Sequence, residues 1–184
     1  MKKCKCDRIT PNNITNLNDN EIFVFGSNES GYHGGGAAKT ALKWGAVWGH
    51  AVGLQGNTYA IPTKTKNAES TLPLDEISNY INIFIDFAKE NKSKQFLVTE
   101  IGCGLAGLKV KDVAPLFIGA VAMENVALPI NFWERLTVDI IETDLDIFES
   151  MIDDFETGGA SYIELEKDIC KCKDAIESLS YGDK

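Results

Sequence analysis

Two glycine-rich loops contain the residues of this chain that are best suited to binding an anion. The later loop follows a β-rich run at residues 95–101 and contains Gly102, Gly104 and Gly107. Glycine lets backbone N–H groups approach a phosphate without a Cβ in the way, and the positive end of a following helix dipole favours the anion. The earlier loop, FGSNESGYHGGG at residues 25–36, repeats this arrangement. Two such loops in one small domain indicate a ligand with a diphosphate.

Strands and helices that alternate along the chain would position these loops. Strands are expected where short apolar runs end at glycine or proline, at residues 21–25, 58–62, 95–101 and 125–129. Helices are expected in segments of helix-forming composition or apolar periodicity, at residues 37–44, 75–92 and 109–123, whereas residues 45–56 are expected to be irregular. This alternation predicts an α/β fold with a three-layer, mixed and mostly parallel sheet. Ligands bind such sheets at the carboxyl ends of the strands, where both glycine loops begin.

Length and composition are typical of one globular domain. The chain has 184 residues, of which 44% are hydrophobic and 24% are charged. The sequence contains no run of 18 apolar residues, so no membrane-spanning segment is expected. The N-terminal sequence MKKCKCDRIT lacks the apolar region of a secretory signal, which predicts a cytoplasmic location.

Charge divides the chain into a neutral body and an acidic appendage. Residues 1–136 carry 14 Lys and Arg against 13 Asp and Glu, whereas residues 137–184 carry 4 Lys against 14 Asp and Glu. We expect residues 137–184 to form two amphipathic helices joined at Gly158 and Gly159. Their acidic side chains disfavour strong non-specific binding of the whole chain to nucleic acid. The appendage is a solvated helical face, a docking element for a protein partner or a mimic of nucleic acid.

The five cysteines offer one metal site as an alternative to free thiols. An odd number of cysteines in a chain without a secretory signal argues against a disulfide framework. Two Cys-Lys-Cys pairs, Cys4 with Cys6 and Cys170 with Cys172, would supply four thiolates to a zinc ion if the two ends of the chain meet. Free surface thiols are the simpler interpretation, and no cofactor is expected.

Three stretches in order along the chain, FGSN…HGGGAAKTAL, YAIPTK and IGCGLAGL, carry a resemblance to a known family. Over about residues 21–134 the chain resembles a macrodomain, the fold that binds ADP-ribose. It is most similar to the branch that contains the terminal ADP-ribose protein glycohydrolase and the DarG antitoxin, and to short macrodomain-like proteins of phages. The resemblance implies ADP-ribose or an ADP-ribosylated macromolecule as the partner.

The resemblance also implies roles for individual residues. The first loop would contact the distal ribose, with Asn28 and His33 bonding its hydroxyl groups and joining Lys64 as candidate catalytic residues, and the second loop would surround the diphosphate. Lys64, at the end of YAIPTK, matches the lysine that acts at the anomeric carbon in this branch. The implied ligand-binding residues are Gly26, Ser27, Asn28, Gly34, Gly35, Gly36, Gly102, Cys103, Gly104, Leu105, Ala106 and Gly107.

Two departures from the family pattern leave the function open. Ala106 stands where the glycohydrolase has a catalytic aspartate and DarG has glycine, and residues 37–38 are alanines where the common macrodomain type has an aspartate. The remaining acidic groups near the site, Glu29, Glu100 and Asp112, match no motif position. The resemblance therefore implies either an ADP-ribosyl hydrolase that uses Lys64 or a binding module for ADP-ribose or a related nucleotide signal. A third hypothesis is a phage protein that antagonises nucleotide-signalling defence.

Several other patterns have simpler interpretations. Residues 102–107 satisfy G-x-G-x-x-G, but a Rossmann domain needs this motif in its first βαβ unit with an acidic residue about 20 positions later. Cys103 would need a base such as His33 or His50 to act as a nucleophile, and a buried thiol under the loop is the alternative. Two tryptophans, Trp44 and Trp48, are expected in the core, with stacking on an adenine as the alternative. Lys64 could equally be a solvated loop residue.

Overall fold

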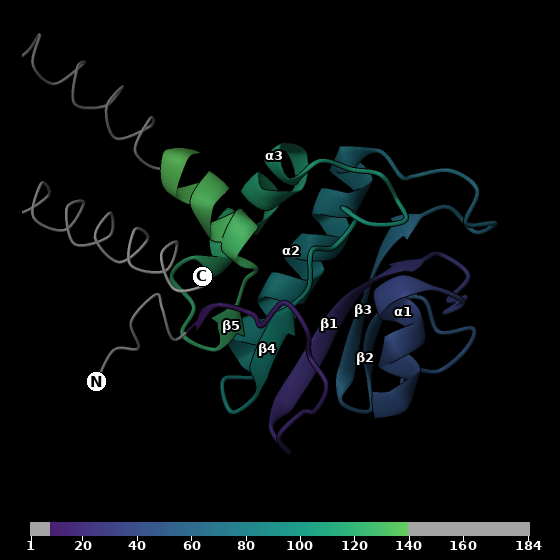
Figure 1. Cartoon of the computed structure of the whole chain (residues 1–184), viewed down its shortest axis with the longest axis horizontal. Coiled ribbons are helices and arrows are strands. Elements are labelled where there is room, and N and C mark those ends of the chain that lie inside the picture. Colours follow the sequence, from purple (N-terminus) through teal and green to yellow (C-terminus); the bar gives the residue numbers. More distant parts are fainter. Residues whose placement is uncertain (1–7, 140–184) are drawn as a thin grey trace, which may run out of the picture. The chain divides into compact units, whose positions relative to one another are not determined.

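A five-stranded mixed sheet organises residues 8–139, the part of the chain that this computed structural model describes (Figure 1). Its strands are β1 (Glu21–Asn28), β2 (Gly53–Gln55), β3 (Thr58–Lys64), β4 (Gln95–Val98) and β5 (Val126–Ala127). They follow the order β2-β3-β1-β4-β5, in which β2 pairs antiparallel with β3 and all other pairings are parallel. The predicted α/β class with a mixed, mostly parallel sheet is confirmed.

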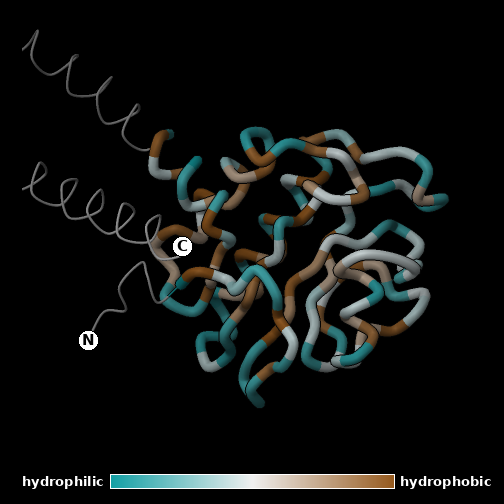
Figure 2. The backbone as a smooth tube through the Cα atoms, in the orientation of Figure 1, coloured by the Kyte–Doolittle hydropathy of each residue, from teal (hydrophilic) through white to brown (hydrophobic). Residues whose placement is uncertain are grey.

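Alternate residues of β1 face two separate hydrophobic clusters. Ile22 and Val24 belong to the larger cluster, which includes apolar residues of the long helix α2 (Leu74–Glu90). Phe23 and Phe25 belong to the smaller cluster, which includes Ala38 and Ala41 of the helix α1 (Gly36–Ala41). This period-two pattern is that of a strand buried on both faces. Figure 2 shows hydrophobic residues concentrated along the central strands and hydrophilic residues in the connecting turns.

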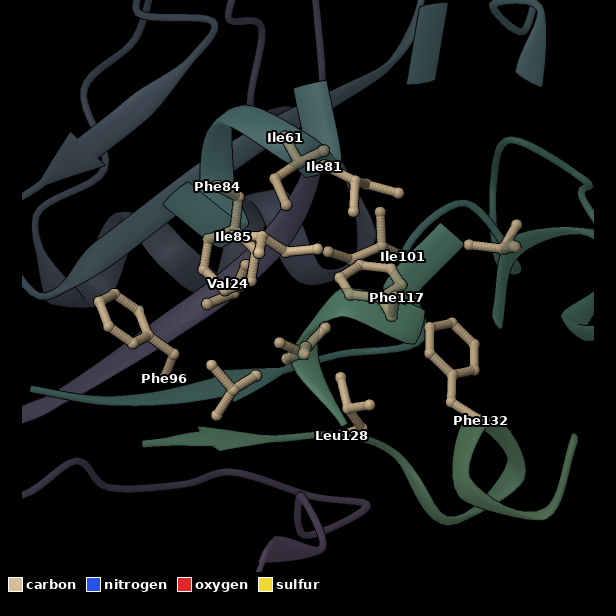
Figure 3. Packing of buried hydrophobic residues seen from close by; sticks show 14 of the residues in the cluster. Val24, Ile61, Ile81, Phe84, Ile85, Phe96, Ile101, Phe117, Leu128 and Phe132 are labelled. Atoms are coloured by element: carbon tan, nitrogen blue, oxygen red, sulfur yellow. The ribbon is translucent and has the colours of Figure 1, made fainter. Parts of the chain in front are cut away.

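The sequence of α2 places charged residues that suit the helix dipole at its two ends and apolar residues along its buried face. Its first turn carries Asp75 and Glu76 and its last turn carries Lys89, which suits the helix dipole. Its buried residues recur every three or four positions: Ile77, Ile81, Phe84, Ile85 and Ala88. Of these, Ile81, Phe84 and Ile85 point toward the sheet (Figure 3). The helix expected over residues 75–92 is thereby confirmed.

The strand β3 continues past Pro62, whereas the sequence indicated that Pro62 would end it. Proline lacks a backbone N–H, so it fits a strand only where no neighbour needs that donor. β2 pairs with Thr58–Ala60 only, and Pro62 lies beyond it, opposite Ser27 of β1. β3 therefore has one partner at Pro62 and extends to Lys64, which pairs with Asn28 after a register shift.

Other element boundaries differ from the sequence expectation for local reasons. The strand expected over residues 95–101 ends at Val98, because residues 101–104 already turn into the glycine loop. The single helix expected over residues 109–123 is a short α-helix, α3 (Val110–Val113), continued by a 3₁₀ helix, η3 (Ala114–Ala120), with a proline in its first turn. The segment 45–56, expected to be irregular, contributes the three-residue edge strand β2.

A helix that the sequence did not predict occupies residues 130–139. Phe132 and Leu136 are fully buried in the larger cluster, and the Trp133 indole Nε1 donates a hydrogen bond to the Arg8 carbonyl at 2.9 Å. The domain boundary expected after residue 136 falls inside this helix. The remainder of the expected acidic appendage and the four cysteines proposed for zinc lie outside the described residues.

Candidate functional site

The carboxyl ends of β1, β3 and β4 meet at one groove of about 590 Å³. The residues between β1 and α1 form one wall, the residues that follow β4 form the other, and Lys64 at the end of β3 lies between them. Most of the residues that the sequence singled out line this groove: Gly26, Ser27, Asn28, Gly34, Gly35, Gly36, Lys64, Gly102, Gly104, Leu105 and Ala106. The structure thus brings together the two glycine loops and the lysine.

The two loops touch, and backbone conformation explains why glycine occupies one of their positions. A Cβ at Gly35 would lie 3.0 Å from Cδ1 of Leu105, the end of an exposed side chain that can move aside. Gly102 has φ +79°, and a Cβ there would lie 2.8 Å from Cδ1 of Leu108. Only glycine adopts that backbone without strain. The loops therefore form one narrow unit, with Leu105 76% exposed at its rim.

Backbone amides on both walls are available to an anion. Within the described part of the chain, the N–H groups of residues 35–37 and 104–106 donate no hydrogen bond. α1 has only six residues and α3 only four, so the helix dipoles add less than the sequence suggested. The unpaired amides are therefore the groups of this groove best suited to receive an anion.

Lys64 places an amine between the two loops. Its Nζ donates a hydrogen bond to the Leu105 carbonyl oxygen at 3.3 Å. Glu100 is the other charged residue that lines the groove, and its carboxylate accepts a hydrogen bond from the Asn131 amide. Of the other acidic residues considered, neither Glu29 nor Asp112 lines the groove.

Asn28 shapes the first loop with all of its side-chain polar atoms. Its Nδ2 donates to the Tyr32 carbonyl oxygen at 2.8 Å, and its Oδ1 accepts hydrogen bonds from the N–H groups of Ser30 and Tyr32. The side chain is 6% exposed. These bonds form an Asx-type turn, so Asn28 stabilises the wall of the groove.

His33 is fully buried and does not line the groove. Its ring packs edge-on against Phe25, with ring centroids 5.2 Å apart, and no hydrogen bond of good geometry reaches either ring nitrogen among the described residues. Burial lowers the pKa of His33, because a charged ring would lose its hydration, although the nearby Val47 and His50 carbonyls and the Gln55 side chain partly oppose the shift. The structure thus places His33 behind the loop rather than against a bound ligand.

Cys103 lines a second cavity, of about 570 Å³, that adjoins the groove at residues 99–100. Burial, together with the charges of Glu100 and Asp112, raises the pKa of the thiol to about 11. A thiol with this pKa is protonated at neutral pH, which argues against a nucleophilic role. Gly107, the last of the proposed ligand-binding residues, does not line the groove but closes the loop by donating its N–H to Gly104.

The sequence did not single out two residues that line the groove, one aromatic and one with a hydroxyl group. Tyr32 and Thr63 line it, and the Tyr32 ring stacks on Trp48 with centroids 5.5 Å apart. Trp48 is 57% exposed, so its expected place in the core is wrong, whereas Trp44 packs on Phe23 in the smaller cluster. The position of Tyr32 inside the first glycine loop was the available signal.

The described residues contain neither a cluster of metal ligands nor a membrane-spanning helix. Within residues 8–139, no group of three or more His, Cys, Asp or Glu side chains is arranged to hold a metal ion. No helix in the same part of the chain is long and apolar enough to cross a membrane. Comparisons of the chain with protein-family models, with curated proteins and with solved structures find no match.

Proposed function

We propose that this chain is a three-layer, macrodomain-like protein that binds ADP-ribose, free or attached to a macromolecule. The observation that carries the proposal is the convergence of both glycine loops and Lys64 on one groove. A volume of about 590 Å³ is within the range of small-molecule and nucleotide sites. The motifs FGSN…HGGG, YAIPTK and IGCGLAGL, which carry the resemblance, supply the walls of this groove.

The groove suits a diphosphate flanked by sugars. Free amides at residues 104–106 on one wall and at residues 35–37 on the other give neutral hydrogen-bond donors for phosphate oxygens. Lys64 adds a positive charge, and Tyr32 adds an aromatic surface at the rim. The cavity beside Cys103 extends the groove and offers room for the remainder of a dinucleotide-sized ligand.

Calorimetric titration with ADP-ribose, using AMP and NAD as comparators, tests the proposal. We expect ADP-ribose to bind more tightly than AMP, because AMP lacks the second phosphate and the distal ribose. A Gly102→Val variant should abolish binding, since φ +79° strains any side chain there and its Cβ would lie 2.8 Å from Cδ1 of Leu108, while an Ile83→Ala variant on the exposed side of α2 should bind normally. Absence of heat with all three ligands would contradict the proposal.

Hydrolysis through Lys64 is a second candidate function, favoured by the position of its Nζ inside the groove. After losing a proton, the amine would attack C1 of the distal ribose, the bond from C1 to the acceptor would break, and the acceptor would leave with that proton. The ribose ring would then open, with the C1–O4′ bond breaking and O4′ taking the second proton of the amine, and this converts the glycosylamine into a Schiff base. Water would hydrolyse the Schiff base, releasing ADP-ribose and restoring the amine. Glu100 is the carboxylate that lines the groove and could transfer these protons.

Paired lysine variants separate hydrolysis from binding alone. On ADP-ribosylated protein and DNA, Lys64→Ala should abolish turnover yet still bind ADP-ribose, whereas Lys66→Ala should behave like the unmodified chain, because Lys66 is exposed and does not line the groove. Equal turnover by the two variants would refute the lysine mechanism. Binding without any turnover by the unmodified chain would leave the binding module as the function.

A further inference from the structure

We propose that Thr71 is a positioning residue that holds the second glycine loop in its ligand-binding conformation, an inference that rests on the function proposed for the groove. Thr71 lies outside the glycine loops and does not line the groove. Its hydroxyl donates a hydrogen bond to the Ala106 carbonyl oxygen at 2.6 Å, which is short for this type of bond. By comparison, Nζ of Lys64 lies 3.3 Å from the Leu105 carbonyl oxygen. Thr71 is thus the closer of the two side-chain anchors.

The bond from Thr71 fixes a peptide unit that is already held at its other end. The carbonyl of the Ala106–Gly107 peptide accepts from Thr71, and the N–H of the same peptide donates to the Gly104 carbonyl oxygen at 2.9 Å. Because a peptide is planar, two bonds on its opposite sides determine its orientation. Gly104 and Gly107 flank this region and permit many other backbone conformations. Without Thr71, the peptide would be held at one end only.

A short hairpin brings Thr71 to this position beside Lys64. Residues 64 and 71 form an antiparallel bridge, and the N–H of Leu72 donates to the Thr63 carbonyl oxygen at 3.0 Å. The turn between them is closed by a bond from the Thr65 N–H to the Ser70 carbonyl oxygen at 2.9 Å. The end of β3, which carries Lys64, is therefore paired with the residue whose hydroxyl holds the second glycine loop. Thr71 thus couples the position of the Lys64 amine to the position of the backbone amides of residues 104–106.

The consequence for binding concerns the amides of residues 104–106. These groups can meet a diphosphate only if the loop backbone is ordered before the ligand arrives, since ordering it afterwards reduces affinity. Thr71 supplies that order without touching the ligand. We expect its loss to weaken ligand binding while leaving the hydrophobic core, and thus global stability, nearly unchanged.

Titration of three threonine variants with ADP-ribose tests this role. Thr71→Val keeps the β-branched shape but removes the hydroxyl, and should weaken binding roughly three- to tenfold. Thr71→Ser retains a hydroxyl and should restore affinity to within about twofold of the unmodified chain. Thr65→Val is the matched control, because the Thr65 hydroxyl bonds to the Ser70 carbonyl within the same hairpin and does not reach the loop. Thermal unfolding of each variant verifies that it is folded.

Amide hydrogen exchange at Gly107, measured by NMR without ligand, separates failure of this proposal from failure of the proposed function. Faster exchange in Thr71→Val than in Thr65→Val supports the positioning role, even if the unmodified chain does not bind ADP-ribose and the proposed function fails. Unchanged exchange at Gly107 would overturn the role of Thr71. If the unmodified chain binds ADP-ribose, equal affinity in Thr71→Val would overturn it as well.

Discussion

At the scale of single residues, His33 shows how burial turns a candidate catalyst into a determinant of stability. The ring is inaccessible to solvent, and it packs against Phe25 and lies 6.5 Å from the ring of Trp48. Its neighbours in the chain, Tyr32 and Gly34, both line the groove. A charge on His33 would therefore be buried directly behind the first loop, and its cost would be expressed as a loss of folding stability.

The stability of the chain should fall on acidification because of His33. In the unfolded chain His33 has its ordinary pKa of 6.5, whereas the folded pKa is lower. The unfolded state therefore binds more protons below pH 6.5, so the stabilising contribution is complete above pH 6.5 and is lost as the pH falls below it. The slope from one such group is at most about 1.4 kcal/mol per pH unit.

Urea unfolding at pH 7.5, 6.5 and 5.5 would measure this dependence. A His33→Gln variant should lose less stability between pH 6.5 and 5.5 than the unmodified chain, because glutamine does not titrate. His50 provides the control, since its side chain is exposed and His50→Gln should retain the full dependence. Parallel pH profiles for all three proteins would show that His33 does not titrate with folding.

Residue types in the two loops predicted that both loops would converge on one groove, but not which of their side chains would line it. The glycines identified the groove, because their role depends on backbone freedom that is local to the sequence. The roles of Asn28 and His33 could not be predicted in this way. The Asn28 side chain forms its hydrogen bonds within the loop, at residues 28–32, and the His33 ring packs against Trp48, which is distant in the sequence. Such packing depends on segments that meet only in the folded chain.

At the scale of elements, α2 packs on one face of the sheet and contacts strands whose carboxyl ends form the groove. The ring of Phe84 meets Tyr59 of β3 and Phe96 of β4 edge-on, with centroids 5.1 and 5.5 Å apart, and it also contacts Phe117 of η3. The ring is fully buried and thus joins three elements. Two of them, β3 and β4, end at the groove.

Removal of the Phe84 ring should destabilise the whole domain. We expect Phe84→Ala to lower the free energy of unfolding by about 3–5 kcal/mol, because it leaves a cavity among three elements. Ile83→Ala, one residue away in the same helix, should change it by no more than about 0.5 kcal/mol, since Ile83 is 54% exposed. Denaturant titration of both variants measures the difference, and similar losses would contradict this account of the core.

Local sequence patterns predicted which helices and strands form better than they predicted the residues at which these elements begin and end. The periodicity of α2 and the apolar run of β1 are properties of contiguous residues, so both elements were predictable. Continuation of β3 past Pro62 depends instead on where its neighbour β2 stops. The 3₁₀ continuation of α3 and the helix over residues 130–139 depend similarly on packing against the sheet and α2.

At the scale of the whole molecule, we expect the helix over residues 130–139 to set the shortest chain that still folds around the groove. Phe132 and Leu136 are fully buried in the larger cluster, and Trp133 is 6% exposed. The last groove residue along the chain is Ala106, so this helix follows the groove in the sequence and completes the larger cluster. The sequence places a domain boundary after residue 136, at the change of charge, and this position lies within the helix.

Two truncations test this boundary. A chain that ends after residue 140 should fold and bind ADP-ribose within about twofold of the full chain at 0.15 M salt, where charges beyond about 8 Å are screened. A chain that ends after residue 129 lacks three buried side chains, each worth about 2–5 kcal/mol, and together these approach the total stability of a typical domain. We therefore expect it to be unfolded by circular dichroism. If the longer truncation folds but no longer binds ADP-ribose, residues beyond 140 contribute to the site, and the groove described here is incomplete.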